Sequence, residues 1–389
     1  MERKNAWAAY AGDDGKVEAF AKAYCDFINN GKTERECVAY GEKLAKAHGF
    51  EDLNAVVRSG RKLNAGARVY VNWMGKSFML FVLGEKPLEE GMNILGAHID
   101  SPRIDVKQNP LYEDTDLAYL DTHYYGGIKK YQWVAIPLAL HGVIVRKTGE
   151  KVIINIGEDE NDPVFCISDL LVHLAQEQMT KNAKEVVEGE ALNLIVGGRP
   201  LEGEEKDAVK ANVLKLLADK YGVEEEDFLS AELEIVPAGK ARDMGFDRSM
   251  ILAYGHDDRV CAYPSMMAVL DYEGTPEYTL CCIVTDKEEI GSVGATGMAS
   301  HYLENTVAEL YACTADYCEL AVRRCLRNSR MLSSDVSAGY DPNFASAFEK
   351  KNSAFLGRGI CFNKFTGSRG KSGSNDANPE FMASLRKIM

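Results

Sequence analysis

The sequence has no surplus of positive charge and no long hydrophobic run. Its 389 residues include 45 Lys and Arg against 59 Asp and Glu, which gives a net charge of −14. This balance argues against a protein that binds nucleic acid and against electrostatic docking on an anionic membrane. The most apolar stretch, 133–145, is too short to span a bilayer. We therefore expect a cytoplasmic protein with no nucleic-acid partner and no membrane partner.

Paired cysteines and a secretory leader are also missing. The ten cysteines are irregularly spaced and form no Cys-x-x-Cys pair, which argues against a disulfide framework or a zinc ribbon. Arg3 and Lys4 have no long apolar region behind them, so no signal peptide is expected. Reduced thiols in a reducing compartment fit this pattern.

Local signals near the N-terminus predict two helices and a hairpin. Apolar residues recur at helical spacing over 17–28, and Thr33 with Glu36 forms a capping-box signature that opens a second helix. Two β-rich runs within 68–84 flank a short turn and predict a hairpin.

Further along, short apolar runs predict buried strands. The runs 92–99 and 278–285 both end in polar residues, and open α/β sheets place their ligands at such strand ends. Helical patterns alternate with them near 262–271, 299–310 and 315–326. This alternation indicates an α/β fold.

The middle of the chain has a different character. Residues 105–165 are rich in Tyr, Val, Ile and Gly and predict antiparallel strands, whereas 168–230 is acidic and is expected to be helical with solvated charge runs. We therefore expect one α/β domain in two parts, 1–104 and 241–389, interrupted by an inserted domain over 105–240.

His98 is the most informative of the seven histidines. It precedes Asp100 by two positions, and residues two apart on a strand share a face. Asp100 can therefore support a histidine that binds a metal. On its own, this motif indicates a hydrogen-bonded loop histidine more readily than a metal ligand.

Three acidic motifs follow His98 along the chain. They are Asp257-Asp258-Arg259, Asp286-Lys287-Glu288-Glu289 and Ser333-Ser334-Asp335. Adjacent acids are usually a surface turn, but paired glutamates directly after a buried strand can serve as a general base and a metal ligand. Together the motifs predict a divalent metal site rather than a nucleophile triad.

The segments GAHIDSPR, DDR, DKEEIGS and SSDVSAGYDPN, in this order, resemble the aspartyl aminopeptidase family of dinuclear metallo-aminopeptidases over nearly the whole chain. The resemblance implies a three-layer α/β metallopeptidase catalytic domain interrupted by a β-rich dimerisation domain. It implies peptide substrates with N-terminal Asp or Glu, and self-association into dimers and a dodecamer. It also implies two zinc ions per subunit, with cobalt or manganese as alternatives.

The resemblance also implies roles for individual residues. The implied metal ligands are His98, Asp257, Glu289 and Asp335. Asp257 bridges the two ions, Glu288 is the general base, and Asp100 supports the histidine ligand. His173 resembles a histidine that the family's dimerisation domain offers to the active site of a neighbouring subunit. Without the resemblance, His173 reads as a histidine on an apolar helix.

The chain departs from the family pattern towards its end. The family carries histidines where this sequence has Ala338 and Asp341, and no histidine follows Asp335 to supply the fifth ligand. The expectation is a C-terminally truncated member that binds its second metal weakly, or a natural short form that borrows or omits that ligand.

Two other functions compete with this one. A catalytically impaired homologue could keep the fold as an assembly or binding protein. A nucleotide site at Gly291, Gly294 and Gly297 is disfavoured, because the spacing is not that of a phosphate loop and two glutamates precede it. For an acidic substrate side chain, a Gly/Ser-rich loop offers Lys364, Arg369 and Lys371, which read equally well as solvated cations.

Overall fold

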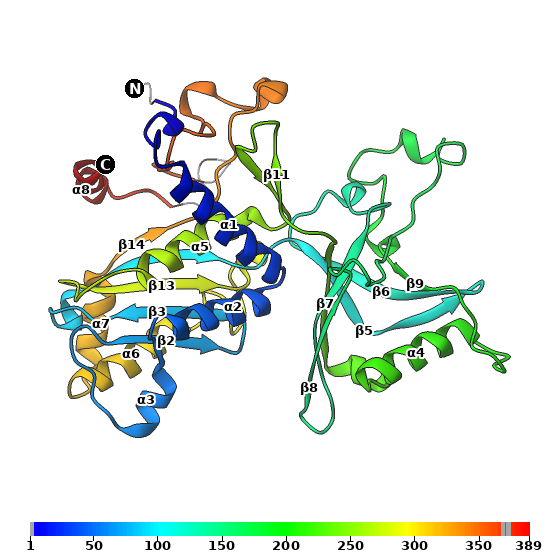
Figure 1. The fold of residues 1–389 in the computed structure, drawn as a ribbon, viewed down its shortest axis with the longest axis horizontal. Coiled ribbons are helices and arrows are strands. Elements are labelled where there is room, and N and C mark those ends of the chain that lie inside the picture. Colours follow the sequence, from blue (N-terminus) through cyan, green and yellow to red (C-terminus); the bar gives the residue numbers. More distant parts are fainter. Residues whose placement is uncertain (1–3, 367–369, 371–374) are drawn as a thin grey trace. The chain divides into compact units, whose positions relative to one another are not determined.

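Figure 1 shows the fold of the chain as a computed structural model that describes residues 4–366, 370 and 375–389. Contacts divide the chain into two compact units, one formed by 22–335 and the other by 1–21 with 336–389. Lys364 belongs to the second unit. Arg369 and Lys371 lie outside the described residues.

The larger unit contains a six-stranded mixed sheet in the order β1-β2-β3-β13-β4-β14. Its strands are β1 (Glu51–Asp52), β2 (Arg68–Trp73), β3 (Ser77–Val82), β4 (Met92–His98), β13 (Thr279–Thr285) and β14 (Arg330–Ser333). The strands β13, β4 and β14 run parallel, while β2 and β3 form an antiparallel hairpin. The hairpin and both buried strands expected from the sequence are confirmed.

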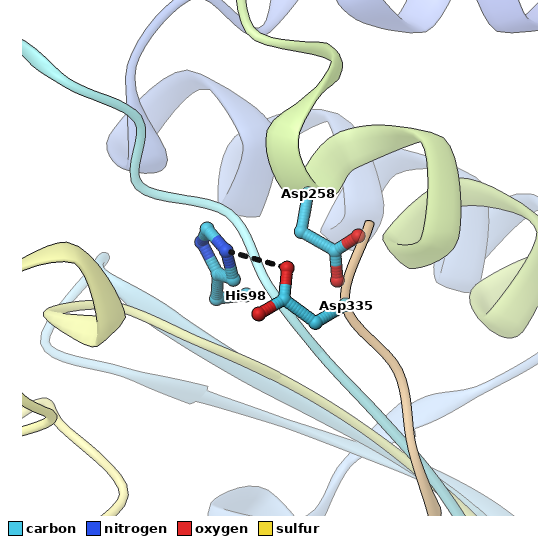
Figure 2. A group of neighbouring side chains, drawn as sticks. All are labelled: His98, Asp258 and Asp335. Atoms are coloured by element: carbon cyan, nitrogen blue, oxygen red, sulfur yellow. Dashed lines mark ion pairs between the residues drawn. The ribbon is translucent and has the colours of Figure 1, made fainter. Parts of the chain in front are cut away.

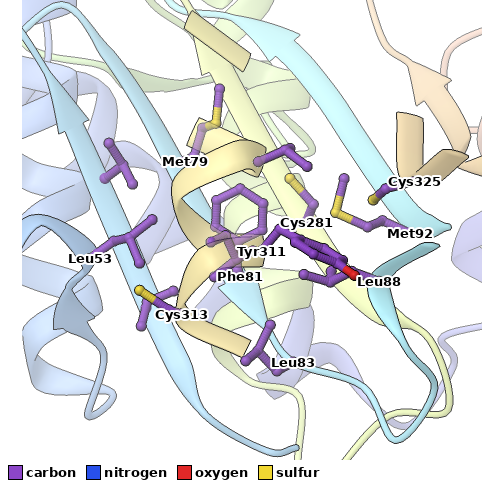
Figure 3. Close-up of a cluster of buried hydrophobic side chains, with 14 of the residues drawn as sticks. Leu53, Met79, Phe81, Leu83, Leu88, Met92, Cys281, Tyr311, Cys313 and Cys325 are labelled. Carbon is purple, nitrogen blue, oxygen red and sulfur yellow. The ribbon is translucent and has the colours of Figure 1, made fainter. Parts of the chain in front are cut away.

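Helices cover both faces of this sheet. One face carries α3 (Leu53–Ser59), α6 (Tyr302–Thr314) and α7 (Glu319–Asn328), and the other carries α2 (Glu34–Ala47), α5 (His256–Leu270) and the end of α1 (Asp14–Asn30). Every residue of β3 is buried, because successive side chains enter opposite cores: Phe81 packs in the cluster of Figure 3, and Phe78 in the other. The predicted three-layer α/β architecture is confirmed.

The start of α2 is fixed by its own side chains. The Thr33 hydroxyl accepts the Glu36 N–H at 3.3 Å, and the Glu36 carboxylate accepts the Thr33 N–H at 3.1 Å. This reciprocal pair satisfies two amide donors that a helix start leaves open. It confirms the capping box expected from the sequence.

A second six-stranded sheet has the order β8-β7-β10-β5-β6-β9, and all its pairs are antiparallel. Its strands are β5 (Arg103–Asp114), β6 (Leu117–Tyr125), β7 (Leu138–Val145), β8 (Lys151–Ile156), β9 (Leu194–Gly197) and β10 (Ala231–Pro237). α4 (Ala208–Tyr221) packs Val213, Leu214 and Leu217 against its core. The antiparallel strands expected over 105–165 are present, and the domain limits at 104 and 240 stay a prediction.

The expectation of helix over 168–230 is wrong for its first part. Residues 168–193 form turns with two three-residue 3-10 pieces, and only α4 is a regular α-helix in this region. The apolar residues here are consecutive, Leu170-Leu171-Val172, rather than spaced by three or four. They therefore make no single helical stripe to pack against a core, and all three are exposed.

The remaining elements are short. They are the strand pair β11 (Arg242–Met244) and β12 (Met250–Leu252), the helix α8 (Pro379–Ile388), and the 3-10 turns Ala6–Ala8, Leu88–Glu90, Lys130–Gln132, Gln178–Thr180, Gly189–Ala191, Glu225–Ser230, Glu288–Ile290, Pro342–Ala347 and Lys350–Asn352. Across the part of the chain that the structure describes, no helix combines the length and the apolar character needed to cross a membrane.

Candidate metal centre

Three neighbouring parallel strands bring polar residues to one edge of the first sheet. β4 ends at His98, which pairs with Thr285 at the end of β13, and the turn with Glu288 and Glu289 follows. Asp335 comes two residues after β14, the strand on the other side of β4. The carboxyl ends of these strands therefore meet at one place, where open α/β sheets bind their ligands.

His98 lies at the middle of this group and is almost completely buried, with 3% of its surface exposed. Its Nε2 atom is 3.2 Å from Asp257 Oδ1 at the start of α5. The same nitrogen lies 3.8 Å from Glu288 Oε2 and 3.8 Å from Asp335 Oδ1. Figure 2 shows the ion pair between His98 and Asp335. One imidazole nitrogen thus faces carboxylates from three separate elements.

Asp100 organises the site from behind His98 and is itself fully buried. His98 Nδ1 donates to the Asp100 carbonyl oxygen at 2.9 Å, which leaves Nε2 to face the carboxylates. The Asp100 carboxylate accepts the N–H groups of Glu288 and Glu289, both at 3.2 Å, and the Tyr125 hydroxyl at 2.8 Å. Asp100 therefore fixes the histidine and the paired glutamates together.

Asp258 is a residue that the sequence interpretation left without a role. It is fully buried, and it points into the group beside His98 and Asp335 (Figure 2). Neither carboxylate oxygen has a hydrogen-bond partner of ordinary geometry among the described residues; the thiol of Cys261 is the polar group beside it. Nothing in an Asp-Asp-Arg run distinguishes a buried carboxylate from a solvated one, so no sequence signal could have identified Asp258.

Burial and crowding shift the pKa values of the group. Burial alone lowers the pKa of His98, but the hydrogen bonds that His98 donates to Asp100, Asp257 and Asp335 outweigh it and raise the pKa from 6.5 to about 12. Burial raises the pKa of Asp258 to about 7. Burial, followed by the charge of Asp257, raises the pKa of Glu289 to about 7. Without a bound cation, burial and mutual repulsion therefore favour the protonated form of these two acids.

The donor set fits divalent metal ions. Two groups have ligand atoms that all lie within 4.8 Å of one another, one made of His98, Asp258 and Asp335 and the other of His98, Asp257 and Glu289. Zinc takes imidazole nitrogen and carboxylate oxygen ligands. A divalent ion would also neutralise the crowded carboxylates and compensate the unpaired oxygens of Asp258.

His173 is not among these residues. It lies in an exposed turn within 168–193, next to the exposed side chains of Val172 and Leu174. The glycines after Glu289 serve the turn itself: Gly291 and Gly294 have positive φ, and an added Cβ at Gly297 would collide with the Ser292 carbonyl oxygen. The backbone conformation at Gly291 and Gly294 and the close contact at Gly297 account for the glycine spacing without a bound phosphate.

A sheet covered by helices on both faces, with such a donor set at the carboxyl ends of its strands, is the architecture of a metal-dependent hydrolase. A family model described as aminopeptidase I zinc metalloprotease (M18) matches residues 27–387. The chain therefore belongs to the M18 family of aminopeptidases, which confirms the resemblance drawn from the four motifs and the assignment as an enzyme.

Individual relatives agree with this family. The chain is 57% identical over 392 residues to a probable M18 family aminopeptidase 1 of Clostridium acetobutylicum, and the match covers 100% of this chain and 84% of the relative. The crystal structure of the M18 family aminopeptidase from Thermotoga maritima matches with a TM-score of 0.93 at 42% identity, covering 100% of this chain and 84% of that one.

A more distant structure shares the fold. It is the S. cerevisiae mApe1 dodecamer, with a TM-score of 0.69 and 21% identity over 87% of this chain and 76% of that one.

Proposed function

We propose that the chain removes N-terminal residues from peptides, preferring Asp and Glu, with the help of two zinc ions. The proposed metal ligands are His98, Asp257, Glu289 and Asp335, with Asp257 shared between the ions. The observation that supports this function best is the position of His98 Nε2, which faces carboxylates at the carboxyl edge of three parallel strands. Cobalt and manganese accept a similar set of ligands.

Glu288 is the proposed general base. Zinc ions held by these ligands would supply Lewis acidity and lower the pKa of a bound water. The Glu288 carboxylate is partly exposed and lies 3.8 Å from His98 Nε2, so it can reach a water at the group. It takes a proton from that water and delivers it to the leaving amine. Asp100 keeps the His98 ring in place through Nδ1.

Replacement of Glu288 by Gln tests this role. The amide keeps the size of the side chain but cannot accept the proton, so turnover of Asp- and Glu-p-nitroanilide should fall by about 10²–10⁴-fold. Metal content, measured by atomic absorption, should stay at the wild-type level. Glu273→Gln, at an exposed position after α5, is the matched control. Near-normal turnover of Glu288→Gln at full metal content would show that another group is the base.

Metal content also separates the enzyme from a non-catalytic homologue. An enzyme of this mechanism binds two ions per chain, whereas a protein that keeps the fold only for assembly or binding has no need of them. A wild-type chain that binds no zinc and hydrolyses no substrate would favour the second function.

The preference for acidic residues is supported by a cavity next to Asp257. The cavity has a volume of about 410 Å³, and its lining includes Lys129, Trp133, Tyr254 and His256. Lys129 is exposed and can approach a substrate carboxylate there. We expect Lys129→Gln to lower the kcat/KM for Asp-p-nitroanilide more than that for Leu-p-nitroanilide, by about tenfold if one ion pair is lost. An equal effect on both substrates would remove Lys129 from the specificity pocket.

Self-association through residues 105–240 is also part of the proposal. The turn 168–193 exposes the apolar side chains of Leu170, Leu171, Val172 and Leu174, and such patches commonly mark interfaces. A partner subunit packed there would bury these side chains and receive His173 near its active site. The dodecamer formed by mApe1 of S. cerevisiae supports assembly of this kind.

We further propose a cytoplasmic location. All ten cysteines are free thiols, which fits a reducing compartment. Fractionation of the cells that make the protein, followed by immunoblotting, tests this location.

A further inference from the structure

A second acidic group lies apart from the candidate metal centre, and side-chain cations already occupy it. Carboxylate oxygens of Glu34, Glu232 and Glu234 lie within 4.8 Å of one another. Lys76 Nζ is 2.8 Å from Glu34 Oε1 and 2.9 Å from Glu232 Oε1. Arg103 Nε is 3.2 Å from Glu234 Oε2, and its Nη1 is 3.4 Å from Glu34 Oε2. The group is therefore a buried ionic network rather than a metal site.

Lys76 joins three elements in this network. It is the last residue of the turn between β2 and β3 and is 7% exposed. Its partners are Glu34 at the start of α2, Glu232 on β10 of the second sheet, and Asp286, whose Oδ2 lies 3.6 Å away. Burial opposes the charge of Lys76, but the three carboxylates outweigh it and raise the pKa of the ammonium group. Lys76 thus remains a cation across the working pH range.

Asp286 connects Lys76 to the turn that carries Glu288. Its carboxylate is fully buried and accepts the Thr296 hydroxyl at 2.6 Å. Its N–H donates to the Ser77 hydroxyl, next to Lys76 in sequence, at 3.2 Å. The chain then passes through Lys287, at a φ of 73°, into the 3-10 turn Glu288–Ile290. The position of Asp286 therefore determines where this turn begins.

Arg103 leads to the same turn by a second route. Its guanidinium lies 3.9 Å from the centre of the Tyr125 ring. The Tyr125 hydroxyl donates to Asp100, which accepts the N–H groups of Glu288 and Glu289. Lys76 and Arg103 both form ion pairs with Glu34, so this buried carboxylate holds both of the cations that lead to the Glu288–Glu289 turn.

We propose that Lys76 is a positioning residue for the aminopeptidase reaction: through Asp286 it holds the turn with Glu288 and Glu289 in place against His98, and through Glu232 it ties that turn to the second sheet. This inference rests on the proposed function. Without the ammonium group, Glu34 keeps only Arg103 as a cationic partner and Asp286 keeps only Lys287, whose Nζ lies 3.1 Å from its Oδ2. Each buried carboxylate is then less well compensated, and removing one partner of a buried ion pair is strongly unfavourable. The turn relieves that repulsion by shifting, which displaces the paired glutamates.

The test compares Lys76→Met with Lys76→Arg in the full chain. Methionine keeps an unbranched apolar stem without the charge, and arginine restores the cation. We expect Lys76→Met to lower kcat by about 10–100-fold with a smaller change in KM, and to weaken zinc binding against a competing chelator by a similar factor. The absorption spectrum of the cobalt-loaded protein should change in Lys76→Met and return towards wild type in Lys76→Arg. Lys107→Met, which removes an exposed ion pair with Glu190, should leave all three measurements unchanged.

A folded Lys76→Met protein with wild-type kcat, zinc affinity and cobalt spectrum would overturn the proposal. If Lys76→Met does not fold, Thr296→Val replaces it, because it removes the hydroxyl bound to Asp286 and leaves every charge in place. Thr296→Val should then change the cobalt spectrum and lower kcat, and wild-type values for both would overturn the proposal equally. If the wild-type chain hydrolyses no peptide, the proposed function fails, while zinc affinity and the cobalt spectrum still decide the role of Lys76.

Discussion

Asp100 contributes to the candidate metal centre through both carboxylate oxygens and its backbone. Its oxygens accept two N–H groups from the Glu288–Glu289 turn, and its carbonyl fixes the ring of His98. Burial alone would favour the protonated acid, but hydrogen bonds from His98 and Tyr125 lower the pKa of Asp100 and keep it ionised. A single residue thus fixes both the ring of His98 and the backbone of the Glu288–Glu289 turn.

We expect Asp100→Asn to weaken zinc binding by about 10–100-fold, the usual loss when a group that orients a metal ligand is removed. The amide can accept only one of the two N–H groups of the glutamate turn, and the neutral side chain loses its ion pair with His98 Nδ1, which lies 3.3 Å from Asp100 Oδ1. Competition against a chromogenic chelator measures the affinity. Tyr125→Phe is the control, because it removes only one hydrogen bond to Asp100 and should have a smaller effect. Equal zinc affinity in Asp100→Asn and wild type would contradict this role.

Only some of the residues at the candidate site could be predicted from the sequence. His98 and the paired glutamates could be singled out because they end or follow short apolar runs, and strand ends gather ligands. Asp335 follows a basic, polar stretch, so its role came from the family resemblance. The burial of Asp258 could not, because an acidic pair looks the same on a surface turn as in a core. Lys76 was missed for a similar reason, since partners such as Glu232 lie far away in the sequence.

At the scale of the element, α2 begins where the two sheets share charged contacts. Its capping box orients Glu34 towards Lys76 and Arg103, and Glu36 towards His141 on β7. The start of one helix therefore contributes carboxylates to two separate sets of buried ion pairs.

We expect Thr33→Ala to lower the free energy of unfolding by about 1 kcal/mol, because the Glu36 N–H loses its acceptor and the helix start loses its cap. Chemical denaturation followed by circular dichroism measures the change. Thr148→Ala, on an exposed loop, is the control and should shift stability by less than about 0.5 kcal/mol. Equal stabilities of the two variants would show that the cap contributes little.

His141 should make the stability depend on pH. Burial lowers its pKa, but bonds to Glu158 and Glu36 outweigh burial and raise it above 6.5; Lys32 is the nearby cation that shares Glu158. Because the pKa of His141 is higher in the folded than in the unfolded protein, its contribution to stability is fully present below the unfolded-state pKa of about 6.5. It is lost as the pH rises through the folded-state pKa.

The difference in unfolding free energy between wild type and His141→Gln should therefore be largest near pH 6 and shrink at higher pH. Denaturation of both proteins between about pH 5 and 9 tests this, with His301→Gln, at an exposed position on the first sheet's helical layer, as the control. A constant or growing difference with pH would contradict the raised pKa.

Elements were predictable wherever a local signal was strong. The Thr33–Glu36 box and the hairpin within 68–84 each have a short-range physical cause, so the sequence predicted them directly. The segment 168–193 has no periodicity, and acidic composition alone was not enough to make it helical. Its conformation depends on the second sheet and on contacts that sequence patterns do not contain.

At the scale of the whole molecule, the exposed apolar turn is the feature most in need of a partner. Leu171 and Val172 are 57% and 71% exposed, with Leu170 and Leu174 beside them. Exposed apolar side chains gathered in one turn are costly in water and gain free energy when another surface covers them.

We expect Leu171→Asp to weaken self-association by at least about tenfold, because an unpaired charge would have to be buried in the interface. Analytical ultracentrifugation at micromolar protein should show smaller species than for wild type. Leu320→Asp, which places the same charge at an exposed apolar position on α7, is the control. Identical sedimentation of all three proteins would argue that copies meet through another surface.

The connectivity of the first sheet also has a consequence for biosynthesis. The candidate ligands run from His98 on β4 to Asp335 after β14, and the whole second sheet is synthesised between them. A nascent chain released up to residue 300 already carries His98, Asp257 and Glu289, but it lacks the edge strand that delivers Asp335. Long sequence separations slow the closure of such contacts, and metal affinity is coupled to folding. The proposed zinc centre is therefore complete only after the ribosome has passed β14, late in the synthesis of the chain.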